Sequence, residues 1–297
     1  MKSILATVAV LLVIACAMPA TAEEKPGAKK KIVLIAGKDS HGRGAHEFRA
    51  GCILLAKALN ENAPGVEAVV TFDGWPKDNA IFDGAAAVVI YCDGGGGHPI
   101  RPQLAFTEEL IKKGVGLGCM HYACEIPKGK DGDAFLKWIG GYYEDGFSIN
   151  PHWTANAVLN KEHPITRGTK AFSVKDEWYV NIRFPEDKKG WSSILDAVPD
   201  DDARSGKTSW PRGPKEHIVK ASGRAETLMW CLERPDGGRG FGFTGGHFHA
   251  NWANDDQRKL VLNAMLWIAK VEVPAEGVPS KTPTPEEMDA NQKPAKK

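Results

Sequence analysis

Continuous apolar runs alternate with helically spaced apolar positions over the first half of the chain. Four such runs predict strands that are buried on both faces, as in parallel sheets: residues 31–36, 66–72, 85–91 and 115–119. Between them, apolar residues recur at helical spacing over 46–60 and 102–113, which predicts a helix in each connection. This alternation of strands and helices is typical of a doubly wound α/β sheet.

The second half of the chain carries shorter strand-like runs among Pro, Gly and Trp residues. We interpret residues 141–235 as an extension of the same sheet with long loops, and its strand-like runs are 155–159, 171–174, 193–198 and 227–231. A late strand is predicted at 240–244, and a closing helix with one apolar face at 255–270. Pro, Lys and Glu then dominate, which predicts a disordered tail over 271–297.

The first 22 residues have the organisation of an export signal. Lys2 provides a short basic start, residues 4–15 are apolar, and 20–22 form a small-residue cleavage site. The apolar run is too short for a membrane span. We therefore predict a signal peptide over 1–22, no integral membrane span, and export to the periplasm or the extracellular space.

Processing of this segment has an alternative. Residues 13–16 resemble a bacterial lipoprotein box, so a lipid anchor at Cys16 is the second interpretation. In both cases residues 23–30 form a polar leader, and 31–270 form the folded domain.

The charge balance narrows the classes of partner. The chain has 38 Lys and Arg against 37 Asp and Glu, and removal of residues 1–22 takes away Lys2 and no acid, which leaves 37 of each sign. Without a basic excess the sequence does not favour a nucleic-acid partner. A small neutral ligand fits this balance better.

Histidines follow the predicted strands at four places. They are His41 and His46 after the first strand, His98 after the third, His121 after the fourth, and His247 and His249 after the late strand. Ligands of open α/β sheets bind beyond the carboxyl ends of the strands. Imidazole transfers protons near neutral pH and also binds zinc. This distribution therefore predicts a site at that edge of the sheet.

Two further segments carry candidate chemistry. Asp93 precedes the glycine run 94–97, which lacks a phosphate-loop signature and predicts a tight turn that approaches a neighbouring loop or a ligand. Asp93 itself would accept sugar hydroxyls or orient a histidine. The string 176–179, Asp-Glu-Trp-Tyr, either holds a sugar between acid and ring or forms a salt-bridged edge with Trp178 in the core.

Cys119 lies near the turn where a nucleophile elbow would stand. Cysteine amidohydrolase chemistry needs a downstream His-x-Glu or His-x-Asp pair, and this sequence has none. A buried thiol is the simpler interpretation. A metal site is another way to use the histidines, and the candidate ligands for zinc or a similar ion are His46, Glu47, His121, His247 and His249.

The order of these motifs carries a family resemblance. The relevant strings are His46-Glu47-Phe48, Gly116-Leu117 through His121-x-Ala123, Ile139-Gly140-Gly141-Tyr142, His163-Pro164-Ile165-Thr166-Arg167-Gly168, Asp176-Glu177-Trp178-Tyr179, Gly238-Arg239-Gly240 and Thr244-x-Gly246-His247 with Trp252. In this order the chain resembles the ThuA-like (trehalose-utilisation) family from about residue 31 to 270. The resemblance implies a flavodoxin-like, class I glutamine amidotransferase-like three-layer sandwich with a mostly parallel sheet and long loop insertions.

The resemblance also implies a class of function. Family members are associated with disaccharide and keto-sugar use, on a scaffold that has lost the ordinary glutaminase triad. Here residues 119–122, Cys-Met-His-Tyr, depart from the more usual Gly-Leu-His-Ser, which leaves the role of the thiol open. Fold alone does not identify a reaction.

The leading hypothesis is an exported enzyme that acts on a neutral sugar, with His121 and His247 as acid/base groups and Glu47 orienting them or the substrate. The expected substrate-binding residues are His46, Asp93, Asp176, Glu177, Tyr179, His249 and Trp252. A divalent metal such as zinc at the histidines stays an open alternative. Two rivals remain, a non-catalytic sugar-binding protein and a glutamine amidohydrolase that depends on Cys119.

Overall fold

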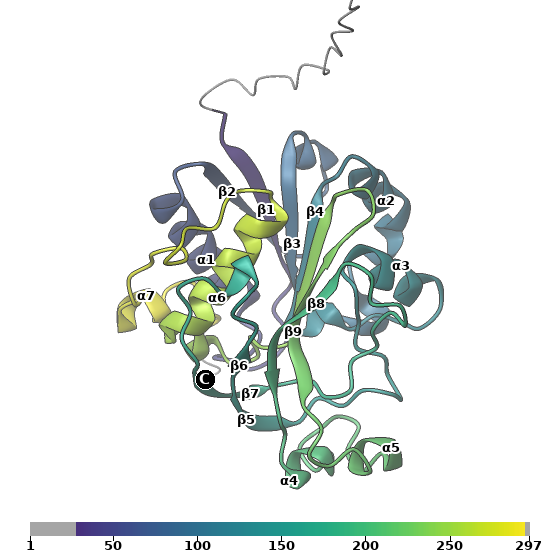
Figure 1. Cartoon of the computed structure of the whole chain (residues 1–297). Helices are drawn as coiled ribbons and strands as arrows, with labels where there is room; N and C mark the ends of the chain where they lie inside the picture. The colour runs from purple at the N-terminus through teal and green to yellow at the C-terminus, as the bar shows by residue number, and fades with distance from the viewer. Residues whose placement is uncertain (1–27, 295–297) are drawn as a thin grey trace, which may run out of the picture.

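An eight-stranded sheet runs through the centre of the protein, whose computed structural model describes residues 28–294 (Figure 1). In spatial order the strands are β2 (Val66–Thr71), β1 (Lys30–Ala36), β3 (Ala85–Tyr91), β4 (Gly116–Met120), β10 (Arg239–Phe243), β9 (Glu226–Glu233), β8 (Trp191–Ala197) and β6 (Val158–Leu159). The strands from β2 to β10 are parallel, and β9, β8 and β6 continue the sheet with antiparallel pairing. The predicted mostly parallel sheet is confirmed.

Helices cover both faces of this sheet, which makes a three-layer sandwich (Figure 1). On one face lie α1 (Phe48–Asn62) and α6 (Asp255–Ile268), and on the other lie α2 (Leu104–Lys112) and α3 (Lys130–Trp138). Within β1, Ile32 and Leu34 belong to the first core while Val33 and Ile35 belong to the second. This two-sided burial explains why the strand is a continuous apolar run.

Helix α3 was not predicted from the sequence. It is short and carries Gly132, a residue that disfavours helix interiors. The structure shows why glycine stands there, since a Cβ atom at this position would lie 2.5 Å from the ring of Tyr142. Close packing of the helix against that ring therefore outweighs the low helix propensity.

The second half of the chain corrects the interpretation of one extended sheet. Strands β8 and β9 join the main sheet, but β5 (His152–Asn156) and β7 (Ser173–Glu177) pair with each other in a separate antiparallel sheet. In β5, buried Trp153 and Ala155 alternate with exposed neighbours, so only one face of this strand contributes to the core. The predicted strand 155–159 is accordingly divided between β5 and β6, which pair with different partners.

Residues 271–294, which we call the C-terminal strap, do not form the predicted disordered tail. Val273 and Val278 are buried, and the Val278 amide donates to Asn263 Oδ1 of α6 at 2.8 Å. The composition suggested disorder because polar residues dominate, yet these two buried valines are enough to dock the segment.

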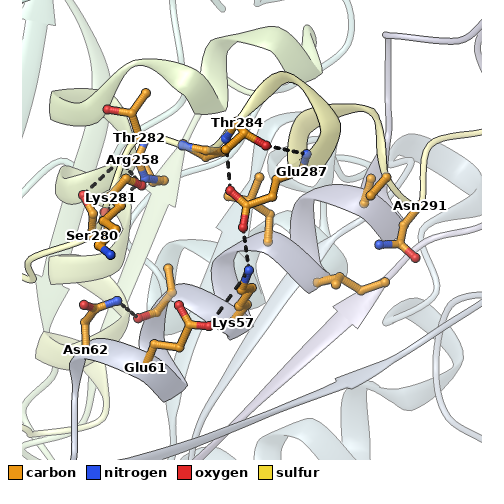
Figure 2. Close-up of a pocket in the computed structure, with 16 residues that line it drawn as sticks. Lys57, Glu61, Asn62, Arg258, Ser280, Lys281, Thr282, Thr284, Glu287 and Asn291 are labelled. Atoms are coloured by element: carbon orange, nitrogen blue, oxygen red, sulfur yellow. Dashed lines mark hydrogen bonds and ion pairs between the residues drawn. The ribbon is translucent and has the colours of Figure 1, made fainter.

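A short helix, α7 (Pro285–Asp289), then closes the strap over α1. It begins with a capping box between Thr284 and Glu287. Glu287 also pairs with Lys57 of α1 at 2.6 Å, and Figure 2 shows these contacts along one wall of a cavity. The capping box and the ion pair fix the direction in which the chain continues.

The strap ends against the loop that follows β1. The Lys293 amide donates to Glu47 Oε2 at 2.9 Å, and its ammonium donates to the carbonyls of Ala45 at 2.7 Å and His46 at 3.2 Å. Lys293 is buried despite its charge. The last turn of the described chain thus restrains the backbone on which His46 stands.

Two expectations concern membranes. Among residues 28–294 no helix has the length and apolarity needed to cross a bilayer. The predicted signal peptide and Cys16 lie outside the described residues.

Replacing Lys293 with alanine should lower the free energy of unfolding by about 1–3 kcal/mol, because two buried carbonyls lose their donor. Urea unfolding of Lys293→Ala measures this. Lys281→Ala removes an exposed lysine of the same strap and should change stability by less than about 0.5 kcal/mol. Equal stability of the two variants would contradict the proposed restraint.

Candidate functional site

Four titratable side chains converge at the carboxyl ends of the strands. His46 follows β1, His121 follows β4, His247 follows β10, and Glu177 is the last residue of β7. The parallel order of β1, β4 and β10 brings the three histidines to one edge of the sheet. All four residues were predicted as site residues, and the separate β5–β7 sheet supplies the carboxylate.

The four ligand-type atoms form a closed ring of short distances. His46 Nε2 lies 3.0 Å from His121 Nε2 and 3.1 Å from His247 Nδ1. Glu177 Oε2 lies 3.3 Å from both His121 Nε2 and His247 Nδ1. All four atoms lie within 4.8 Å of one another. We refer to these residues as the histidine–glutamate cluster.

Hydrogen bonds on the far side of two rings fix which nitrogens face inward. His121 Nδ1 donates to the carbonyl of Thr244 at 2.9 Å, and His46 Nδ1 donates to Asp93 Oδ1 at 2.9 Å. In a neutral imidazole the other nitrogen then carries a lone pair. When both rings are neutral, the Nε2 atoms of His46 and His121 therefore point lone pairs at each other across 3.0 Å.

Both of these histidines have backbone conformations that side chains rarely adopt. The φ angle is +50° at His46 and +53° at His121. Such a conformation costs roughly 1–3 kcal/mol and recurs where function requires a fixed geometry. His121 opens the sharp turn η4 (His121–Cys124) directly after β4, so it occupies the strained turn at which a nucleophile elbow was considered.

Cys119, the candidate nucleophile, lies inside β4 instead. Its side chain is fully buried in the apolar core, and burial raises the pKa of its thiol well above the ordinary value. A nucleophilic cysteine needs access and a stabilised thiolate. This environment provides neither, which argues against the Cys119-dependent amidohydrolase.

The electrostatics of the cluster centre on Glu177. Burial alone would raise the pKa of this carboxyl, but hydrogen bonds from His121, His152 and His247 hold it well below its usual range. Burial lowers the pKa of His121, and the bond and charge of Glu177 outweigh this and raise it. For His46, burial prevails over Asp93 and lowers the pKa to about 3. Glu177 is thus an anion, and His46 is neutral.

Two predicted acids accept hydrogen bonds from the backbone of loops that carry site histidines. Glu47 accepts from the Gly44 amide at 2.8 Å and from Lys293, so it holds its own loop and does not join the cluster. Asp176 accepts from the amides of Gly246 at 2.7 Å and Phe248 at 3.3 Å, on either side of His247. Both therefore position histidine-bearing backbone, which corrects the expectation that Asp176 binds substrate.

Two further predicted residues, Trp252 and His249, lie outside the pocket, and a third, Tyr179, is buried at its wall. Trp252 is fully buried beside Tyr91, so it is a core residue and not a pocket wall. His249 is buried, and its Nε2 bonds to the Met288 carbonyl of the strap at 3.0 Å. Tyr179 packs its ring 5.3 Å from that of His121 and is 1% exposed, although its edge reaches the pocket wall. Trp178 is likewise in the core.

A pocket of about 380 Å³ opens beside the cluster. Its lining residues are His41, His46, Tyr122, Glu125, Tyr143, Asp145, Asn150, Glu177, Tyr179, Trp210 and Pro211. A larger cavity of about 570 Å³ lies between α1 and the strap (Figure 2), where no histidine reaches. The smaller pocket is the candidate site because His46 and Glu177 of the cluster line it together with two further carboxylates, Glu125 and Asp145.

Sequence reasoning missed several residues here, among them Glu125 and Trp210, which line the pocket, and His152, which lies beside Glu177. Glu125 stands four residues after His121, so the same strand exit could have indicated it. His152 lies at the start of β5 with Nε2 3.6 Å from Glu177 Oε1. Trp210 belongs to the insertion between β8 and β9, where no strand-exit pattern points to a site.

The glycine run after β3 serves the close approach predicted for it. A Cβ atom at Gly94 would lie 2.0 Å from the Tyr122 carbonyl oxygen, and the Gly95 amide donates to the Glu125 carbonyl at 2.9 Å. The run therefore packs against the loop that carries Glu125. Burial, then the charges of Asp145 and Glu177, raise the pKa of the Glu125 carboxyl to about 7.

Comparisons with known proteins agree with this architecture. A family model described as "ThuA: Trehalose utilisation" matches residues 33–268. A ThuA-like protein from Bacteroides uniformis superposes with a TM-score of 0.57 at 16% identity, covering 83% of this chain and 94% of that one. One from Parabacteroides merdae gives 0.54 at 18%, covering 86% and 93%. Identities this low show the fold alone, and no curated protein matches the chain.

Replacing Glu125 with glutamine should stabilise the metal-free protein at pH 8. The folded state holds a proton on Glu125 between about pH 4.5 and 7 that the unfolded chain releases, so stability falls as pH rises through this window. Glutamine has no charge to bury, and we expect a gain of about 1–3 kcal/mol at pH 8 and little at pH 4.5.

Urea unfolding with a chelator at the two pH values measures this difference. Glu276→Gln, which changes an exposed acid, should leave both values unchanged. A Glu125→Gln protein no more stable than wild type at pH 8 would contradict the assigned environment.

Proposed function

Because the chain belongs to the ThuA (trehalose utilisation) family, we propose that it is an exported carbohydrate-utilisation enzyme. Its reaction centre would be a divalent cation held by His46, His121, His247 and Glu177. The family description supports a carbohydrate as the substrate, and the histidine–glutamate cluster supports a metal-dependent reaction.

The facing lone pairs of His46 and His121 carry this proposal. In the neutral rings the bond on the other side makes each of these two nitrogens an acceptor, and at 3.0 Å they repel unless a positive charge lies between them. A proton on His121 Nε2 removes the repulsion between this one pair of nitrogens. A cation at the centre of the ring would attract all four ligand atoms, including the buried carboxylate of Glu177.

The donor set fits such an ion. Zinc binds imidazole nitrogen and carboxylate oxygen at about 2.0–2.1 Å, so neighbouring ligand atoms stand about 3.3 Å apart in a tetrahedral site. The four separations around the ring run from 3.0 to 3.3 Å. Metal-binding histidines also donate their second N–H to a carboxylate or a carbonyl, as His46 does to Asp93 and His121 to Thr244. Manganese, iron and nickel use similar ligands.

The surrounding residues have distinct tasks in this proposal. A bound cation would polarise a substrate oxygen or a water. Glu125, whose pKa is raised to about 7, is suited to exchange a proton with a substrate at neutral pH. Asp93 orients His46, and Asp176 orients the loop of His247.

The lining of the pocket favours an uncharged substrate. Glu125, Asp145 and Glu177 all face it, and phosphate groups would meet repulsion there. Carboxylates accept hydrogen bonds from sugar hydroxyls. A neutral sugar therefore remains the expected substrate class, and a sugar-binding protein without turnover is the alternative that enzymatic assays separate.

The cation proposal makes a direct prediction. Purified protein incubated with zinc and dialysed should retain about one ion per chain, and His121→Ala and Glu177→Ala should bind it at least about 10-fold more weakly. The same two variants should lose turnover of a panel of disaccharides and keto-sugars. Elemental analysis and calorimetry measure the first effect, and product detection the second.

A matched control is available for this experiment. His217→Ala removes an exposed histidine outside the cluster and should keep the ion. If wild-type protein holds no zinc, manganese, iron or nickel, the cluster instead uses the protonated His121 as an acid/base group, as the sequence hypothesis had it.

Export is proposed from the sequence of residues 1–22. Expression in a bacterial host with secretion should yield a chain that begins at Glu23, measured by intact mass. A chain that begins at a lipid-modified Cys16 would support the lipoprotein alternative. A full-length chain retained in the cytoplasm would contradict both.

A further inference from the structure

We propose that Trp210 forms a stacking subsite for the ring of a carbohydrate, opposite the histidine–glutamate cluster. The inference deepens the proposed function and rests on it, because it names how the substrate is held. Trp210 is 79% exposed, while Trp178, Trp230 and Trp252 are fully buried.

This exposure is not a sign of a loose loop. The Trp210 amide donates to Asn150 Oδ1 at 2.9 Å, and the amide of His152 donates to Thr208 Oγ1 at 3.0 Å. Further along the same insertion, Lys215 Nζ donates to the Ser148 carbonyl at 2.7 Å. The insertion is therefore fastened to residues 148–152 at three points.

Within the insertion, Gly206 and Gly213 come together and close the loop 206–213, and we call this pair the neck of the loop. The Gly213 amide donates to the Gly206 carbonyl at 3.2 Å, and a Cβ atom at Gly206 would lie 2.4 Å from the Gly213 carbonyl oxygen. Gly206 has a φ of +69°, so both this backbone conformation and the close approach of Gly213 favour glycine at the position. Trp210 stands near the tip of the loop that this neck closes.

Asn150 connects the backbone of Trp210 to the cluster. While its Oδ1 accepts from Trp210, its Nδ2 donates to Glu177 Oε1 at 3.1 Å. One side chain thus fixes both the backbone that carries the indole and the carboxylate that faces the histidines. A loop whose backbone is held in advance loses little conformational entropy when a ligand binds.

The pocket around the indole selects a ligand with two kinds of surface. An exposed indole gains free energy by covering apolar C–H groups. Beside it stand the carboxylates of Asp145, Glu125 and Glu177, which accept hydroxyl donors and repel anions. A pyranose ring has an apolar face and a rim of hydroxyls, so it matches both, whereas a nucleotide carries phosphates that the acids disfavour.

A cation is the competing occupant, because acids and an indole also attract alkylammonium groups. The two ligands differ in what they need. A sugar requires the flat face of a ring, and an acyclic polyol with the same hydroxyls lacks that face. This difference separates the alternatives experimentally.

The test uses zinc-incubated whole protein and calorimetric titration with trehalose, maltose and glucose. Mannitol serves as the acyclic control and tetramethylammonium as the cationic one. We expect at least one ring sugar to bind and mannitol not to. Trp210→Ala should weaken sugar binding about 10-fold or more, and Trp210→Phe should weaken it by less than about 5-fold.

The tryptophan fluorescence of the same samples gives a second measurement. The sugar-induced change should disappear from Trp210→Phe and persist in Trp191→Phe, a variant outside the pocket. Saturable binding of tetramethylammonium without sugar binding would overturn the inference. Failure of all three ring sugars to bind, or equal affinity in Trp210→Ala, would do so too.

Failure here is distinguishable from failure of the cation proposal. Trp210 is not one of the four residues whose atoms form the cluster, so Trp210→Ala should retain zinc as wild type does. A protein that binds zinc but no ring sugar overturns the subsite alone. A protein that binds a ring sugar through Trp210 but no metal overturns the cation centre alone.

Discussion

One buried anion determines how the site is arranged. The carboxylate of Glu177 is only 11% exposed, and a charge removed from water is stable only beside an opposite charge. Its neighbours at 3.3 Å are nitrogens of His121 and His247. The sheet of β5 and β7 carries the acid to the histidines, Asn150 fixes its second oxygen, and Asp176 fixes the loop that carries His247.

The sequence predicted all four cluster residues as site residues, and it predicted the three histidines and the parallel half of the fold for one physical reason. Strands buried on both faces are continuous apolar runs, and their carboxyl ends meet at one edge, so His46, His121 and His247 could be placed together. The sequence did not distinguish Glu177 from the other predicted acids, because the strand that carries it belongs to a separate sheet. No local pattern distinguishes that sheet from an extension of the first.

The errors have physical reasons too. Trp252 follows a site histidine in the sequence but turns into the core beside Tyr91. The strap looked disordered by composition, while two buried valines and a capped turn dock it. Trp210 could not be predicted as a site residue, because neither its exposure nor its position at the pocket follows from the local sequence. Side-chain direction and long-range docking are set by tertiary contacts that composition and periodicity do not contain.

The strap has a consequence for how far the functional unit extends. The family match ends at residue 268, yet Lys293 holds the backbone of His46 and Met288 holds His249. By thermodynamic linkage, a strap that favours one position of His46 favours whatever binds to that position, and the bound group in turn tightens the strap. Any ligand that binds at the histidines should therefore raise the protease resistance of the strap, a segment that contributes no residue to the histidine–glutamate cluster.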